Sequence, residues 1–239
     1  MTELPLPTGE DWRALELRSE ALPESARRAI VEHWTRAAHM EHASVATLSY
    51  FSLQLLAIGA PLSLIEDALR AALDEVKHAE LCFSLATTYA GRAIGPQPLS
   101  LDEHALSGCD LQSVAVGTAE KGCVGETIAA LEAEAAAALA EESAVRAVQL
   151  RICDDESRHA ELAWRFVRWA EQIGGAAVRA ALHAAFQRTL ERFEVATPPE
   201  PTLEYRLEAH GILSERRKQA VHREVMNEVV RPVLAELSS

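Results

Sequence analysis

The sequence predicts an all-α protein, in which a four-helix bundle is followed by additional helices. Hydrophobic residues make up 49% of the chain but aromatic residues only 5%, and Ala is very common. Runs rich in Val, Ile and Thr, which favour strands, are few, whereas long runs without Pro are rich in Ala, Leu and Glu. One pattern occurs twice within such runs, as DEVKHAEL at 74–81 and DESRHAEL at 155–162. This composition favours closely packed helices over a sheet.

Pro and Gly delimit the first two helices. Residues 1–24 contain Pro and little periodicity, so we expect an N-terminal arm that packs on the bundle or on a partner. A first helix should then extend from Ser25 to about Ile58. A second helix, after Pro61, should end just before Gly91, which suits a helix C-cap.

A connection and a glycine-containing helix come next. Residues 91–111 hold several Gly and Pro without a helical stripe, and about 20 extended residues can reach about 65 Å. The third helix should cover about 112–140. It contains three glycines, Gly117, Gly122 and Gly125, each of which costs about 1 kcal/mol relative to Ala in a helix interior. Either close helix packing or a helical bulge with a pocket beside Glu126 would explain them.

The rest of the sequence predicts a long fourth helix followed by shorter helices and a linker. That helix should span about 144–173 and end at Gly174-Gly175, and a fifth should follow at 176–195. A Pro-rich linker at 197–201, a short helix ending at Gly211 and a last helix at 214–230, before Pro232, complete the chain. We therefore divide the chain into an arm (1–24), a bundle (25–173) and additional C-terminal helices packed on the bundle (174–239).

The repeated pattern places a Glu and a His on one helix face in each copy. Residues three apart on a helix are neighbours, so the two side chains of each Glu-x-x-His can reach one metal ion. A lone Glu precedes each copy on an earlier helix, 34 residues before in the first pair and 30 in the second. If each lone Glu and its motif lie on an antiparallel pair of helices, the turn should lie midway between them. In the first pair this midpoint falls near Gly59, which together with Pro61 favours a turn, and in the second it falls near Ser143. The alternative is that the Glu and His residues lie on two unrelated, solvent-exposed helix faces, but this leaves the in-frame repeat unexplained. If these carboxylates point into the bundle, burying them without a metal would be costly.

This order of Glu, Glu-x-x-His, Glu and Glu-x-x-His, over roughly residues 27–172, resembles the ferritin-like di-iron carboxylate proteins. The resemblance implies a ferritin-like four-helix bundle with a long crossover that makes the second and third helices parallel. It implies six metal ligands: Glu41, Glu75, His78, Glu126, Glu156 and His159. It also implies that Asp155 orients His78 and that Asp74 orients His159. The first copy departs from the usual form by having Lys77 where the second has Arg158.

Carboxylate and imidazole ligands suit Fe, Mn or Zn. The resemblance implies two Fe ions, with Mn or mixed Mn/Fe as alternatives, and O2 or peroxide as a reactant, with an external electron donor. We expect an oxidase or oxygenase acting on a small organic substrate. The alternatives are iron oxidation or peroxide removal, as in rubrerythrin-like proteins or di-manganese catalase, and a metal-stabilised binding module without turnover.

Charge and cysteine usage limit the partners. A formal net charge of −13 argues against binding to nucleic acid, which needs clustered Lys and Arg. The N-terminus shows no secretory leader, and residues 43–60 are too short and polar for a membrane span. The four Cys form no Cys-x-x-Cys, and Cys82, on the ligand-facing stripe, is expected to be core rather than redox-active. We therefore expect a cytoplasmic protein, which could form a homodimer through its C-terminal helices.

Overall fold

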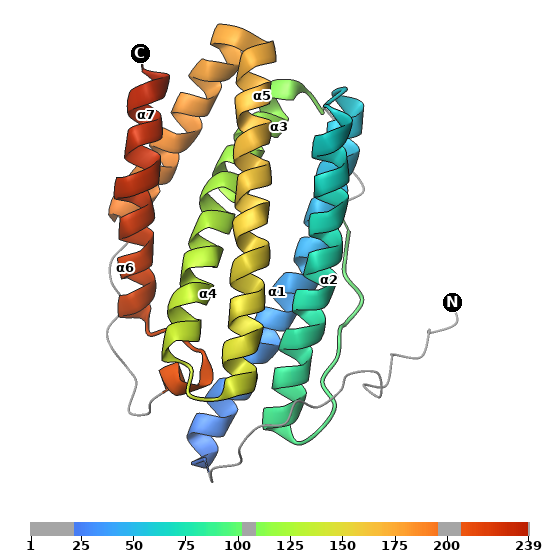
Figure 1. The fold of residues 1–239 in the computed structure, drawn as a ribbon, viewed down its shortest axis with the longest axis vertical. Helices are drawn as coiled ribbons and strands as arrows, with labels where there is room; N and C mark the ends of the chain where they lie inside the picture. The colour runs from blue at the N-terminus through green and yellow to red at the C-terminus, as the bar shows by residue number, and fades with distance from the viewer. Residues whose placement is uncertain (1–21, 102–108, 196–206, 239) are drawn as a thin grey trace, which may run out of the picture.

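The computed structural model of the protein describes residues 22–101, 109–195 and 207–238, and these residues contain helices but no strand. The predicted all-α class is confirmed. Four helical columns lie side by side (Figure 1). They are α1 (Glu24–Ala57), α2 (Leu62–Ala90), a column of α3 (Leu111–Thr118), a π-helix (Ala119–Glu126) and α4 (Thr127–Leu139), and the first part of α5 (Ser143–Val195). None of the described helices is long and apolar enough to cross a membrane.

The helix directions follow from the connections. α1 and α2 form an antiparallel hairpin, whose turn uses the positive φ of Gly59 (69°) and has Pro61 as the N-cap of α2. Gly91 ends α2 in the left-handed conformation, with φ 64°. The chain from 92 to 101 then runs back along α2 without regular structure, so α3 begins at the same end of the bundle as α2 (Figure 1). The second and third columns are therefore parallel. Residues 102–108 of the predicted connection lie outside the described residues.

The third column is interrupted where the three glycines predict it. Asp110 caps α3 by accepting a hydrogen bond from the backbone N–H of Ser113 at 3.0 Å. The helix then widens into a π-helix over Ala119–Glu126, which includes Gly122 and Gly125. A β-carbon at Gly122 would lie 2.8 Å from the Ala163 β-carbon, so this glycine permits close packing on α5. Close helix packing and a helical bulge, the two explanations that the sequence left open for these glycines, thus both apply to the segment Ala119–Glu126.

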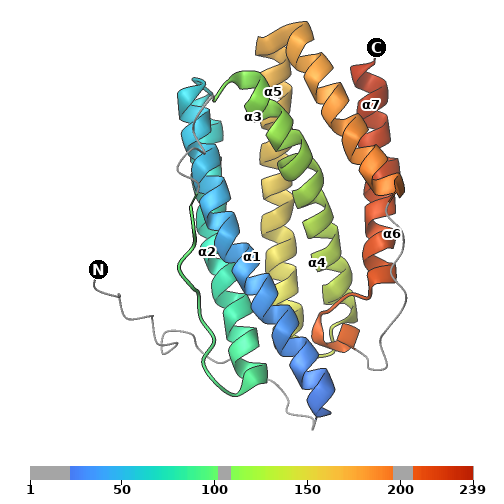
Figure 2. The ribbon, with the colours of Figure 1, turned by 180° about the vertical axis from the view of Figure 1, so that it is seen from behind.

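Paired glycines reverse the chain at the end of the bundle. Gly175 has φ 59° and ψ −144° and breaks α5 at the predicted position, while a β-carbon at Gly174 would overlap Val178. The residues of α5 after this kink fold back toward α4 (Figure 2). The fourth and fifth predicted helices are the two parts of α5.

The C-terminal helix differs from its predicted boundary. A 3-10 turn (Leu207–His210) precedes α6 (Glu215–Val225), which continues through a second π-helix (Met226–Val230) into α7 (Arg231–Leu237). The predicted end at residue 230 is wrong. Pro232 is tolerated because it lies within the first turn of α7, where a missing N–H breaks no α-helical hydrogen bond. α6 packs on α4, and α7 packs on α5. The predicted linker at 197–201 and residues 1–21 of the predicted arm lie outside the described residues.

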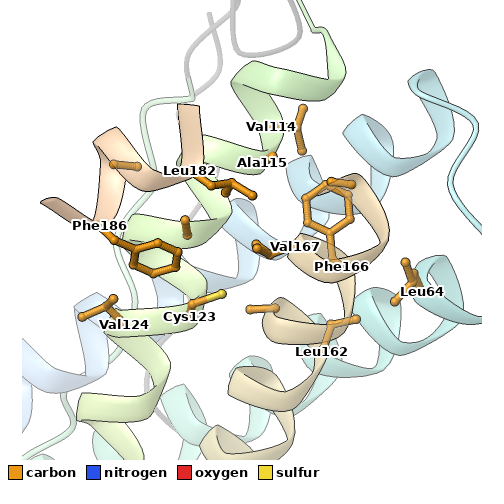
Figure 3. Packing of buried hydrophobic residues seen from close by; sticks show 14 of the residues in the cluster. Leu64, Val114, Ala115, Cys123, Val124, Leu162, Phe166, Val167, Leu182 and Phe186 are labelled. Carbon is orange, nitrogen blue, oxygen red and sulfur yellow. The ribbon is translucent and has the colours of Figure 1, made fainter. Parts of the chain in front are cut away.

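Two apolar clusters fill the interior at different heights. One surrounds Phe166, Leu182 and Phe186 and includes residues of the C-terminal helices (Figure 3). The other surrounds Trp34 and Phe83 near the opposite end of the bundle. Each column passes from one cluster to the other across a short polar interval, which contains the Glu and His residues of the repeated pattern. A polar layer therefore lies between two apolar clusters.

Candidate metal centre

The six predicted ligands meet in this polar layer, contributed by all four columns. Glu41 comes from α1, Glu75 and His78 from α2, Glu126 from the π-helix, and Glu156 and His159 from α5. The four residues of the two Glu-x-x-His motifs are buried, with no more than 3% of each exposed. Glu41 and Glu126 are partly buried. The repeat brings the motifs together because α2 and α5 each turn the same helix face toward the interior.

The first group of candidate ligand atoms surrounds the Nδ1 atom of His78. This atom lies 3.4 Å from Glu156 Oε1, 3.6 Å from Glu75 Oε2 and 3.8 Å from Glu41 Oε2. One ligand atom from each of these four residues lies within 4.8 Å of the others. A single ion placed among them could contact three carboxylates and one imidazole.

The second group surrounds the Nδ1 atom of His159. This atom lies 3.2 Å from Glu75 Oε1 and 3.6 Å from Glu156 Oε2. Glu126, Glu156 and His159 have ligand atoms that all lie within 4.8 Å of one another. Glu75 and Glu156 therefore present one oxygen to each histidine. Glu156 therefore belongs to both groups of candidate ligand atoms, whereas Glu41 belongs only to the first and Glu126 only to the second.

The two histidines differ in what holds their outer nitrogen. His78 Nε2 lies 3.1 Å from Asp155 Oδ2, a hydrogen bond when Nε2 carries the proton. Asp155 is fully buried, and Arg151 Nε donates to it at 2.6 Å while Arg158 also pairs with it. His159 Nε2 lies 3.6 Å from Asp74 Oδ2, which is too long for a hydrogen bond. The geometry orients the first histidine more tightly than the second.

The basic residues of the two copies have different roles. Arg158 crosses to α2, where its Nη2 atom lies 3.1 Å from Asp74. Lys77 pairs instead with Glu80 on its own helix, at 2.7 Å. Residues three apart on a helix are neighbours, so Lys77 reaches this acid more easily than one on another helix. Arg151 was not among the predicted site residues, although its position four residues before Asp155 is a typical helix ion-pair spacing.

The environment separates the pKa values of the four Glu carboxylates. Burial raises the pKa of Glu41 to about 7, although the nearby His78 imidazole opposes the shift. Burial and the neighbouring Glu156 raise the pKa of Glu126 to about 10. Burial would also raise the pKa values of Glu75 and Glu156, but close contact with the two histidines holds both below their usual range. Glu75 and Glu156 are thus anionic at neutral pH, whereas Glu126 holds a proton when no metal is bound.

The same contacts favour positively charged histidines in the metal-free site. Burial would lower the pKa of His78, but the nearby carboxylates of Glu156, Glu41 and Glu75 outweigh it and raise the pKa to about 12. Burial opposes the shift of His159 as well, and its carboxylate neighbours raise its pKa to about 10. Protons therefore compensate the anionic Glu75 and Glu156 in the metal-free site, and a metal ion would compete with these protons.

Several buried polar atoms in this layer have no hydrogen-bond partner among the described residues. They are Glu75 Oε2, His78 Nδ1, Glu156 Oε2, His159 Nδ1 and His159 Nε2. A buried polar atom without a partner costs about 1–3 kcal/mol. All but the last belong to the two groups of candidate ligand atoms. The Glu and His cluster could therefore hold a metal ion, and its oxygen and nitrogen donors suit Fe, Mn or Zn.

Two cavities reach the centre from different sides. One of about 280 Å³ lies between α1, the third column and α5, and its lining includes Glu126 and His159. Its floor contains the buried apolar side chains Leu48, Val114 and Leu162. The other, of about 220 Å³, lies between α2 and α5 on the far side of His159. Its acidic residues are Asp67, Asp74 and Glu161, and its basic residues are Arg70, Arg158 and Arg165.

Cys82 is fully buried in the apolar cluster around Phe83, as expected for a core residue. Burial, and then the nearby Glu41 and Glu75, raise the pKa of its thiol, so it stays protonated at neutral pH. A protonated, enclosed thiol is a poor nucleophile.

No protein-family model matches the chain, and neither a curated protein nor a solved structure matches it significantly. Its function is therefore inferred from its own residues and geometry.

Proposed function

We propose that the protein is a ferritin-like di-iron oxidase or oxygenase, which uses O2 to oxidise a small organic substrate. The observation that carries this proposal is the 280 Å³ cavity, which combines an apolar floor with the candidate ligands Glu126 and His159 in one lining. A small apolar substrate lying there would be next to the centre. Pockets of this kind, mostly apolar with a few polar groups, are typical small-molecule sites.

The helix arrangement supports the ferritin-like part of the proposal. The first and fourth columns run in one direction and the second and third in the other, with a long connection along α2 (Figure 1). Two columns supply one Glu each, and the other two supply Glu-x-x-His. Ferritin-like di-iron bundles have this distribution of ligands.

Different residues of the site would have different roles in this reaction. Iron bound here would supply the redox chemistry that allows O2 to react with an organic molecule. Glu75 and Glu156 would hold two ions together, because each directs one oxygen to either side. Asp155 would keep the proton on His78 Nε2, leaving Nδ1 free to bind metal. The apolar floor would exclude water beside Glu126.

Insertion of one oxygen atom into a C–H bond also needs two electrons and two protons, and the second oxygen atom leaves as water. An external electron donor would supply these electrons. Oxidation that removes two electrons from the substrate needs no such donor and reduces O2 to hydrogen peroxide.

Iron oxidation or peroxide removal is the main alternative. The polar cavity near Asp74 and His159 favours it, because a solvent-filled path could admit an ion. Three carboxylates and three guanidinium groups line this cavity, and three pairs of them are in contact: Arg165 with Asp67 at 2.7 Å, Arg70 with Asp67 at 3.4 Å and Arg158 with Asp74 at 3.1 Å. This balanced charge attracts cations weakly. A metal-stabilised module without turnover is the third candidate.

Anaerobic loading with Fe(II), followed by O2, separates these functions. We expect a small apolar substrate to accelerate O2 consumption and to yield an oxidised product. Rapid O2 consumption driven by excess Fe(II) alone, with no effect of any organic molecule, would favour iron oxidation. Absence of O2 consumption in protein that holds iron would favour the module without turnover.

A further inference from the structure

The cavity beside Glu126 contains one cationic side chain, that of Lys121. Lys121 is exposed on the π-helix and is the single Lys or Arg among the described residues that line this cavity. Within the described part of the chain it forms no ion pair or hydrogen bond. Its neighbour Glu120 faces elsewhere, since it pairs with Arg188 at 3.1 Å and Arg192 at 3.4 Å. Although the chain has a net charge of −13, no acid among the described residues compensates this ammonium group.

The cavity is also amphipathic. Leu48, Val114 and Leu162 of its floor are less than 10% exposed. Polar side chains share the lining, among them Thr47 and Ser113, which are exposed. Glu126 is its one carboxylate and belongs to the candidate metal centre. A ligand with an apolar body and one negative charge would match both surfaces.

The cavity is long relative to its volume. Its lining on the third column extends from Ser113 to Glu126, which is about 20 Å at 1.5 Å per residue. The cavity therefore extends along the third column rather than lying at one level of the bundle. Lys121 lies between these ends, about 7 Å along the helix from Glu126. A carboxylate held by Lys121 would therefore leave a flexible chain within reach of the centre.

From these observations we infer the substrate class of the proposed oxidase, and the inference rests on that proposed function. The substrate is a linear aliphatic monocarboxylate. Its carboxylate pairs with Lys121, and its hydrocarbon chain passes Leu48 and Leu162 of the floor toward Glu126. Lys121 is a specificity-determining residue, because it selects an anion where the floor alone would accept any apolar molecule of suitable size.

Calorimetric titration of the metal-loaded protein tests this assignment, with octanoate compared with octanamide, which has nearly the same shape and no charge. We expect octanoate to bind more tightly. Lys121→Gln should weaken octanoate binding about tenfold, equivalent to about 1.4 kcal/mol, with little effect on octanamide. Lys121→Arg should retain most of the affinity. Lys218→Gln is the matched control, because it removes the same charge from α6 and should leave binding unchanged.

Equal affinity for octanoate and octanamide would overturn the inference. An equal loss in Lys121→Gln and Lys218→Gln would also overturn it, because overall charge would then explain the binding. Measurement of O2 consumption with the same ligands separates this inference from the proposed function. Lys121-dependent binding without O2 consumption would support the carboxylate site and contradict the oxidase. Oxidation of neutral molecules without carboxylate binding would support the oxidase and contradict the carboxylate site.

Discussion

The side chains of Asp155 and His78 meet across the interface between α5 and α2, with Oδ2 and Nε2 3.1 Å apart. The equivalent pair from the other copy of the motif, Asp74 and His159, is 3.6 Å apart. Both aspartates pair with Arg151 and Arg158, but Asp155 is fully buried, whereas the Asp74 side chain is 21% exposed. A repeat that is symmetric in sequence thus gives two unequal halves of the centre.

This asymmetry predicts unequal effects of removing the two aspartates. Asp155→Ala should weaken metal binding about 10- to 100-fold, because His78 loses the partner that fixes its tautomer and ring orientation. Asp74→Ala should have a smaller effect, since no hydrogen bond to His159 is lost. Competition with a chelator of known affinity measures both. Equal losses in the two variants would contradict the proposed difference.

The cavity beside the π-helix predicts different results at two glycines. A β-carbon at Gly117 would meet nothing within 4 Å, so Gly117→Leu can fill the cavity without overpacking. We expect it to impair substrate oxidation while metal content and thermal stability are kept, because Leu is also the better helix former.

Gly122→Ala is the matched control. Its β-carbon would lie 2.8 Å from the Ala163 β-carbon, so it should lower the free energy of unfolding by about 1–3 kcal/mol through overpacking. Thermal denaturation and O2 consumption measured on both variants distinguish the two effects. A stable Gly117→Leu protein with full substrate oxidation would contradict the proposal that the substrate binds in this cavity.

The shifted pKa values predict that metal loading releases protons. At pH 7 the metal-free site holds one proton on each imidazolium, one on Glu126 and about half of one on Glu41, because all four pKa values are raised, to about 12, 10, 10 and 7. Binding requires neutral histidines and anionic carboxylates, so about three protons should leave per chain. Metal affinity should therefore fall as the pH falls. Zn(II) titration in weak buffer with a pH indicator measures the release, and its absence would contradict the proposed ligand set.

Several features could be predicted from the sequence because they depend on local chemistry. The in-frame repeat places Glu75 with His78, and Glu156 with His159, on one helix face each, whatever the packing. Gly174-Gly175 predicts the reversal of α5 because Gly175 needs a positive φ. The three glycines of the third column predict its irregular section, since a regular helix gains nothing from them.

Other features depend on packing, which the sequence pattern does not determine. The last helix passes through Pro232 because that residue lies in the first turn of α7. Lys77 could have reached either a local or a distant acid, and its flexible side chain contacts Glu80. The role of Lys121 arises only from the position of the π-helix beside α1. Its sequence neighbours do not indicate that it lines a cavity instead of pairing with an acid.

The six Glu and His residues are proposed to hold two metal ions, and every other proposal depends on this arrangement. It is tested most directly by the metal content of protein reconstituted with Fe(II), freed of excess iron and analysed by elemental mass spectrometry. We predict two iron ions per chain, fewer than two in Glu126→Ala, and none in Glu75→Ala, because Glu75 contacts both groups of ligand atoms. One ion or none in the folded wild-type protein would contradict the di-metal centre.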